Sequence, residues 1–131
     1  MRLLLIRHAE AAPGEPDEGR RLTPEGRAQA AALGERLAAA GVRPDAVLTS
    51  PLLRARETGE AVAQALGCSS EPTEALAPGA TADDVRAAVE GRGEKIVVVG
   101  HQPDCGRIAA ELGDGREPPF PPAGLAEVEL P

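Results

Sequence analysis

Both histidines of the chain stand directly after short apolar runs. Residues 3–6 read Leu-Leu-Leu-Ile and are followed at once by Arg7 and His8, whereas residues 97–100 read Val-Val-Val-Gly and are followed by His101. A guanidinium offers forked, permanently charged donors to an anion. A neutral imidazole can attack an electrophilic centre or exchange a proton near neutral pH. These residue types in this setting predict a site for an anionic substrate.

The apolar runs are too short for helices and predict strands that are buried on both faces. A third run, at residues 45–49, is followed by Ser50-Pro51 and then by Arg54. Ligands of an open α/β sheet bind beyond the carboxyl ends of the strands, so we expect the residues after the three runs to share one pocket. The alternative is that the arginines are solvated and the histidines are ordinary loop or core residues. For Arg7 and His8 alone that alternative would be favoured, but both histidines fall at strand ends, which weighs against it.

Capping residues and apolar spacing predict helices between these strands. Thr23 is a typical N-cap, Pro24 suits the first helical turn, and Gly41 suits the end of that helix. Thr81 and Asp84 have the spacing of a capping box at the start of another helix. Two further helices are expected, one from Ser50-Pro51 to about Leu66 and one from about Asp104 to Leu112. The other expected strands are a weak edge strand over 69–75, a strand over 95–99, and a last strand in which Ala126, Val128 and Leu130 alternate with polar residues. Two loops complete the chain: a polar loop over 12–22 that can fold over the end of the first strand, and a proline-rich loop over 113–123. This order predicts an α/β fold, a three-layer α/β/α sandwich around a mainly parallel sheet.

The composition limits the possible partners. The chain has 131 residues, which suits one domain over residues 1–131, and Phe120 is its single aromatic residue. Base-stacking surfaces are difficult to build without aromatic side chains, and a net charge of −7 opposes binding to nucleic acid. A phosphate site would therefore be a local basic pocket in an acidic protein. No run is long enough to span a membrane and the start is too short for a signal peptide, so we expect no membrane partner and a cytoplasmic location.

The two cysteines carry no sign of a metal site. Cys68 and Cys105 are isolated in the sequence, with no Cys-x-x-Cys pair and no neighbouring histidines to suggest a metal site. We expect both to be buried, reduced thiols.

Three stretches of the chain resemble the signatures of the histidine phosphatase superfamily. They are Arg7-His8 after an N-terminal strand, Ser50-Pro51-Leu52-Leu53-Arg54-Ala55-Arg56-Glu57-Thr58, and Val97-Val98-Val99-Gly100-His101. The short chain and the stretch Arg20-Arg21-Leu22-Thr23-Pro24-Glu25-Gly26 resemble the SixA-like phosphohistidine phosphatases within that superfamily. The resemblance covers nearly the whole chain in order. It implies a phosphoglycerate mutase-like fold with a mostly parallel sheet, flanking helices and one antiparallel strand.

The resemblance also implies a phosphatase that needs no metal or cofactor and works through a phosphohistidine intermediate. His8 would be the nucleophile, and an acceptor such as a backbone carbonyl would hold its second ring nitrogen. Arg7, Arg54 and His101 would contact the phosphoryl oxygens and stabilise the transition state. The residues expected to bind the substrate are Arg20, which matches the family's phosphate-binding arginine, Ser50, at the expected helix N-terminus, and Gln102.

Two positions depart from the family's pattern. Ala9 stands where the first signature usually has glycine, which adds one methyl group near the pocket floor but removes no catalytic group. Arg21 stands where a proline often precedes the Leu-Thr pair, and we expect its side chain to be exposed to solvent.

The sequence offers no clear proton donor for the leaving group. Relatives of broad specificity use a glutamate or aspartate from the region after the second helix. The carboxylates available there are Glu71, Glu74, Asp83 and Asp84, and none lies in a recognisable motif. Phosphohistidine depends less on a proton donor, because imidazole, with an unperturbed pKa of about 6.5, leaves far more easily than an alkoxide. Glu10, beside the nucleophile, is either a local acid or base or, as we favour, a loop-capping or solvated residue.

We therefore expect a phosphatase that acts on phosphohistidine carried by a protein. The chain lacks the long insertions that form a lid in the mutases, which favours an open site. One alternative is a phosphomonoesterase of small molecules, such as a sugar or nucleotide phosphate. Another is a non-catalytic phosphate-binding module of the same fold, although such a module would have no need of the nucleophile.

Overall fold

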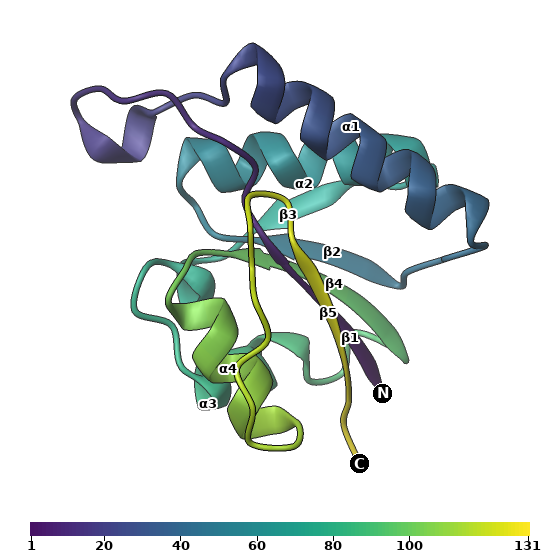
Figure 1. Ribbon diagram of the computed structural model, residues 1–131. Coiled ribbons are helices and arrows are strands. Elements are labelled where there is room, and N and C mark those ends of the chain that lie inside the picture. The colour runs from purple at the N-terminus through teal and green to yellow at the C-terminus, as the bar shows by residue number, and fades with distance from the viewer.

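A five-stranded sheet forms the middle layer of the protein (Figure 1). The structure is a computed structural model that describes residues 1–131. Its strands are β1 (Arg2–Arg7), β2 (Ala46–Thr49), β3 (Ser70–Pro72), β4 (Lys95–Gly100) and β5 (Leu125–Glu129), in the spatial order β3-β2-β4-β1-β5. All neighbouring strands pair in parallel except β5, which pairs antiparallel with β1. The predicted mainly parallel sheet with one antiparallel strand is confirmed.

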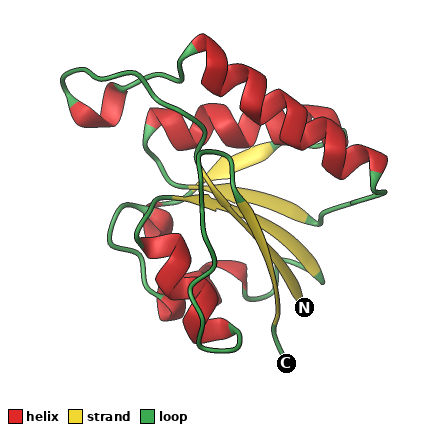
Figure 2. Cartoon of the chain, viewed as in Figure 1, coloured by secondary structure: helices red, strands yellow, loops and turns green.

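The four α-helices of the chain cover the two faces of this sheet, an arrangement that can be followed in Figures 1 and 2. They are α1 (Pro24–Ala39) and α2 (Leu53–Leu66) on one face, and α3 (Ala82–Val89) and α4 (Asp104–Leu112) on the other. Side chains of β1 point alternately to the two faces. Leu3 and Leu5 pack in one core cluster with α3 and α4, whereas Leu4 and Ile6 pack in the other with α1 and α2. All four are buried, and each such side chain stabilises the fold by about 1.5–3 kcal/mol. The fold is therefore the predicted three-layer sandwich.

The predicted starts of α1 and α3 are confirmed. Thr23 Oγ1 accepts a hydrogen bond from the backbone N–H of Gly26 at 2.9 Å, which caps α1. Thr81 and Asp84 form the reciprocal capping box of α3.

The predicted start of α2 at Ser50-Pro51 is wrong. The helix begins at Leu53, because Leu52 keeps an extended backbone with φ −69° and ψ 141°. Ser50 Oγ accepts from the N–H of Leu52 at 3.2 Å, so its hydroxyl caps a turn before the helix. The serine-proline pair therefore marks a tight turn between β2 and α2.

Two smaller expectations also differ from the structure. The weak edge strand is confined to β3 and is followed by a 3-10 helix, η2 (Glu74–Leu76). Cys105 is buried as expected, but Cys68 is exposed in the turn after α2. None of the helices combines the length and the apolar character that crossing a membrane would require.

Two loops approach the carboxyl end of β1. Residues 12–22 include a 3-10 turn, η1 (Asp17–Gly19), which contacts α2, so this loop does fold over the strand end. The proline-rich loop before β5 approaches the same strand end: Arg7 N donates to Gly124 O at 3.0 Å, and Ala123 N donates to His8 O at 3.2 Å.

Candidate active site

The register of the sheet brings three strand ends together. β1 and β4 end in register, and β2 ends one residue short of them. His8, Ser50 and His101 follow these ends, and the ladder continues through them: His8 N donates to Gly100 O and Ser50 N to Val99 O, each at 3.0 Å. The ring centroids of His8 and His101 are 5.2 Å apart. Both histidines therefore lie at one edge of the sheet, as predicted.

A cavity of about 340 Å³ lies at this edge, within the usual range for small-ligand pockets, and no hydrophobic residue lines it. The predicted site residues on its wall are Arg7, His8, Arg20, Arg54, His101 and Gln102. Ser50 is the exception, since it is completely buried behind His101 and does not reach the wall. Two larger hollows beside β5, of about 450 and 580 Å³, contain none of the predicted site residues.

His8 has one ring nitrogen free for chemistry. Its Nδ1 lies 2.7 Å from Ala9 O, so Nδ1 carries the proton and donates it to that carbonyl. This is the backbone acceptor predicted from the sequence, and it leaves the lone pair of Nε2 available. Burial, and after it the charges of nearby arginines, lower the pKa of His8 to about 4. The imidazole is therefore neutral at pH 7, as a nucleophile must be.

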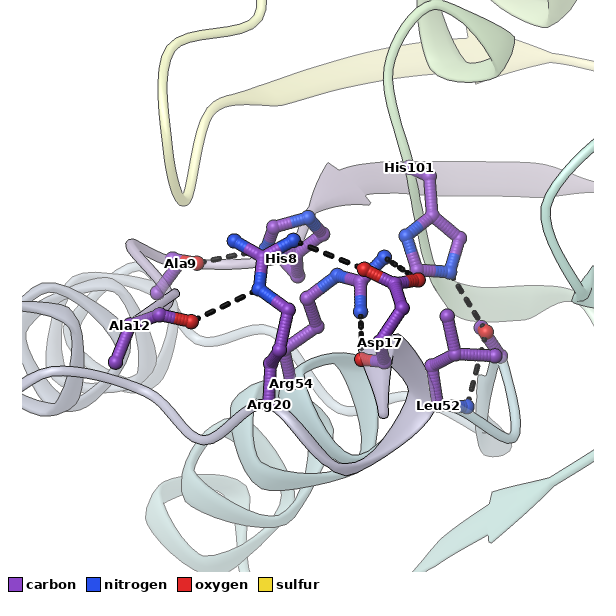
Figure 3. A network of polar contacts seen from close by, with 9 residues as sticks. His8, Ala9, Ala12, Asp17, Arg20, Leu52, Arg54 and His101 are labelled. Atoms are coloured by element: carbon purple, nitrogen blue, oxygen red, sulfur yellow. Dashed lines mark hydrogen bonds and ion pairs between the residues drawn. The ribbon is translucent and has the colours of Figure 1, made fainter. Parts of the chain in front are cut away.

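Asp17 of η1 joins two of the cavity's arginines (Figure 3). Its Oδ1 accepts from Arg20 Nη1 at 3.1 Å and its Oδ2 from Arg54 Nη2 at 3.3 Å. Its backbone carbonyl accepts from Arg54 Nη1 at 2.9 Å, and Ala12 O accepts from Arg20 Nε at 2.8 Å. The hydrogen bond from Arg20, followed by the charge of Arg54, holds the pKa of Asp17 below its usual range. One exposed carboxylate thus orients two guanidinium groups.

The arginines still keep donors for an anion. Arg7 donates from Nη1 to Phe120 O at 3.0 Å, which ties it to the proline-rich loop. The Nε atoms of Arg7 and Arg54, on the cavity wall, are buried without a hydrogen-bond partner, as is that of Arg56, which does not line the cavity. Buried guanidinium N–H groups are normally satisfied, so for Arg7 and Arg54 the arrangement fits a ligand with several oxygens.

His101 is held by Ser50. The residue is 5% exposed, and its Nε2 lies 2.7 Å from Ser50 Oγ. Burial, followed by the proximity of His8 and Arg54, lowers the pKa of His101 to about 4, so this ring is also neutral at pH 7.

Gln102 is oriented by the helix that follows it. Its Oε1 accepts from Gly106 N at 2.8 Å in the first turn of α4. This bond assigns the amide orientation and leaves the NH₂ group as the part available to a ligand. Arg21, by contrast, is exposed, as expected.

Four residues of the wall are not predicted from the sequence, namely Pro78, Gly79, Pro103 and Asp104. Asp104 Oδ2 accepts from Gly79 N at 2.7 Å, which ties the loop before α3 to the start of α4. Asp104 lies just after a strand end, and that position was the signal that could have identified it. Pro78 and Gly79 belong to a loop whose place in space no local pattern reveals.

The carboxylates first considered as proton donors do not line the cavity. Glu71 pairs with Arg92, and Asp83 pairs with Arg86. Glu74 lies in η2, and Asp84 belongs to the capping box of α3. Glu10 is absent from the wall as well, and its backbone bonds Gln29 and Thr23 near the start of α1. No group of three or more His, Cys, Asp or Glu side chains is arranged to hold a metal ion.

Replacing Arg54 with alanine is expected to weaken phosphate or vanadate binding by about 10- to 100-fold, because one charge-assisted hydrogen bond contributes about 1.5–3 kcal/mol. Isothermal titration calorimetry measures this loss. Arg56→Ala is the matched control, since Arg56 lies two residues further along α2 and does not line the cavity. Equal losses in both variants would contradict a direct role of Arg54 in anion binding.

Known proteins share this sequence pattern. The model of the histidine phosphatase superfamily (branch 1) matches residues 3–78, which include the first two signatures. The phosphohistidine phosphatase SixA of Escherichia coli is 31% identical over 138 aligned residues, covering 99% of this chain and 86% of SixA. An uncharacterized protein of Picosynechococcus is 38% identical over 125 residues, covering 88% of this chain and 75% of that protein.

Solved structures share the fold. A structure of the protein histidine phosphatase SixA complexed with tungstate matches with a TM-score of 0.87 at 28% identity, covering 97% of this chain and 86% of the other. A native mycobacterial glucosyl-3-phosphoglycerate phosphatase matches with a TM-score of 0.71 at 18% identity, covering 96% of this chain and 88% of the other, which is a likeness of fold alone. Since the family model spans more than half of the chain and the SixA likeness spans nearly all of it, this chain belongs to the histidine phosphatase superfamily as a SixA-like member with the phosphoglycerate mutase-like fold.

Proposed function

We propose that this phosphatase hydrolyses phosphohistidine carried by another protein, through a phosphorylated His8. The observation that carries the proposal is the free Nε2 of a neutral His8, set among arginines in a mainly polar cavity. The relative that supports the substrate class is SixA of Escherichia coli, which is similar over nearly the full length of this chain. The cytoplasmic location expected from the sequence remains a prediction.

In the first step, the lone pair of His8 Nε2 attacks phosphorus. The phosphorylated ring of the substrate takes a proton from solvent on its other nitrogen. The bond from phosphorus to the ring nitrogen then breaks, its electron pair stays with that nitrogen, and neutral imidazole leaves. Charge spread over the three phosphoryl oxygens meets the guanidinium groups of Arg7, Arg20 and Arg54, which stabilise the transition state electrostatically. The carbonyl of Ala9 keeps the proton on Nδ1 throughout.

In the second step, water attacks the phosphorus of phospho-His8. The phosphorus–Nε2 bond breaks, its electron pair returns to Nε2, and the proton of the attacking water passes to solvent. Phosphate is released and the neutral His8 is restored. Neither step calls on a metal or a cofactor.

The leaving group favours phosphohistidine over an alkyl ester. The one carboxylate on the cavity wall, Asp104, already accepts a hydrogen bond from Gly79. An alkoxide leaving group calls for a positioned proton donor, whereas imidazole depends on one much less.

The test is to incubate the protein with a phosphorylated histidine-containing phosphotransfer domain and to measure phosphate release. Release at a rate above that of free sugar phosphates supports the proposal. Tight binding of the phosphorylated domain without release would instead indicate a non-catalytic phosphate-binding module.

A phosphomonoesterase of small molecules is the second candidate. The presence of Asp104 on the cavity wall favours it, because a carboxylic acid there could protonate a departing alkoxide. Faster hydrolysis of a sugar or nucleotide phosphate than of the phosphorylated domain would select this candidate.

Turnover is expected to fall only as the pH drops through about 4. The neutral form of His8 is the nucleophile, and burial followed by nearby arginines lowers its pKa to about 4. Because the phosphate of an aryl phosphate itself titrates at about pH 6, kcat/KM is calculated for the dianionic substrate, and it should then stay level from pH 8 down to the acid end. An acid limb near the ordinary histidine value of about 6.5 that remains after this correction would contradict a buried nucleophile.

The same shifts affect stability with a definite sign. Unfolded histidine takes up a proton near pH 6.5, whereas folded His8 and His101 do so only near pH 4. The unfolded state therefore binds more protons between these values, and stability falls as the pH drops through this window. Thermal unfolding measured at each pH separates this loss from the loss of turnover.

A further inference from the structure

We infer that Ser50 is a positioning residue that fixes which ring nitrogen of His101 carries the proton. The effect on the ring follows from the contacts alone, and its kinetic consequence rests on the proposed function. Ser50 follows β2 directly and is completely buried, so its hydroxyl meets protein atoms rather than water.

The contact between the two side chains fixes the orientation of the ring. Ser50 Oγ lies 2.7 Å from His101 Nε2, which is a hydrogen-bond distance. Turning the ring over would put a C–H group at that position, where 2.7 Å is too close. A nitrogen must therefore face the hydroxyl.

The second contact of the hydroxyl decides the direction of the hydrogen bond. Ser50 Oγ accepts from Leu52 N at 3.2 Å, and its own proton has one acceptor within reach, His101 Nε2. If Nε2 carried the proton instead, the hydroxyl proton would be buried without an acceptor, which is unfavourable. Ser50 therefore donates to Nε2, and a neutral His101 must carry its proton on Nδ1.

The consequence lies on the other side of the ring. Nδ1 of His101 is buried and has no partner within the protein. In Figure 3 it points toward the side of the site where His8 and the Arg54 guanidinium lie. A proton on Nδ1 makes this atom a donor to a phosphoryl oxygen, whereas the other tautomer would direct a lone pair at the same oxygen. Ser50 thereby sets His101 as a neutral donor, alongside the charged donors of the arginines.

The first experiment measures the tautomer directly. Protein labelled with ¹⁵N in histidine is studied by NMR at pH 7 without substrate, because protonated and unprotonated ring nitrogens have well-separated shifts. We expect His101 to be protonated on Nδ1 in the unaltered protein and to change toward protonation on Nε2 in Ser50→Ala. Protonation on Nε2 in the unaltered protein would overturn the inference, even if the variant failed to fold.

The matched control removes a neighbouring buried hydroxyl. Thr49 is also completely buried, but its Oγ1 donates to Ser50 O at 2.9 Å and makes no hydrogen bond to His101. Thr49→Val is expected to leave the His101 tautomer as it is. A change of tautomer in both variants would indicate general loosening of the turn and would overturn the specific role of Ser50.

The second experiment measures the consequence for turnover. Ser50→Ala is expected to lower kcat by about 10²-fold, the scale of losing one donor to a developing oxyanion, and to change KM by less than about twofold. Thr49→Val is expected to retain kcat. If Ser50→Ala changes the tautomer of His101 but leaves kcat unchanged, Ser50 has no role in the reaction and that part of the inference is overturned. If the unaltered protein releases no phosphate, the proposed function fails, while the tautomer measurement still decides the role of Ser50.

Discussion

Replacing His8 with alanine is expected to lower kcat by on the order of 10⁴-fold or more, because the attacking nitrogen is lost. Anion binding should persist, since Arg7, Arg20 and Arg54 remain on the cavity wall. Phosphate or vanadate titration therefore separates binding from chemistry. This split between binding and turnover is the signature of a nucleophile rather than of a substrate ligand.

Trapping the intermediate identifies the nucleophile among the two histidines. The protein is mixed with a substrate carrying a radioactive phosphoryl group and denatured within one turnover. Label bound to nitrogen should appear on the unaltered protein and, more slowly formed, on His101→Ala, but not on His8→Ala. Because the chain has two histidines in all, this pair of variants covers both possible sites. Near-normal turnover in His8→Ala would contradict the proposed mechanism.

The arrangement of the two histidines could be predicted because it follows from the backbone. Short aliphatic runs predict buried strands, and parallel strands end at the same edge of a sheet. His8 and His101 each stand next to such an end, so the register of β1 and β4 brings them together without help from any loop. The same local logic correctly predicted the capped starts of α1 and α3, where the side chain that caps each helix is itself in the motif.

The features that could not be predicted depend on contacts between distant segments. Asp17 lies in a polar loop, and nothing local reveals that its carboxylate joins Arg20 to Arg54 on α2. The prediction that α2 starts at Ser50 is wrong for a related reason. The Ser-Pro pair resembles a helix start, but the hydroxyl bonds Leu52 and the ring of His101, some fifty residues away in sequence. The place of Asp104 near a strand end is predictable, but its hydrogen bond with Gly79 is not, because it joins two distant segments.

Hydrolysis is expected to become slower in the order phosphohistidine, aryl phosphate, alkyl phosphate. Imidazole leaves with an ordinary pKa near 6.5, a phenol such as the tyrosine side chain has one near 10, and an alkoxide is a much stronger base. General acid catalysis is typically worth about 10²–10⁴-fold, so the alkyl ester should have a kcat/KM lower by about that factor when no acid assists it. The measurement compares a phosphorylated phosphotransfer domain, phosphotyrosine and a sugar phosphate with one preparation of the protein.

Asp104→Asn decides whether the wall carboxylate takes part. Asparagine keeps an oxygen that can accept the hydrogen bond from Gly79 but cannot act as an acid at neutral pH, so the wall loop stays in place. Because imidazole needs no strong acid, we expect the variant to retain turnover of phosphohistidine and to keep the same order of substrates. Glu74→Gln is the matched control, since Glu74 is a carboxylate near α3 that does not line the cavity. A selective loss of sugar-phosphate turnover in Asp104→Asn alone would identify Asp104 as the leaving-group acid. If the unaltered protein also hydrolyses the sugar phosphate substantially, small phosphate esters would replace phosphohistidine as the substrate class. The reason is that Asp104 would then protonate an alkoxide leaving group, a step that imidazole does not need.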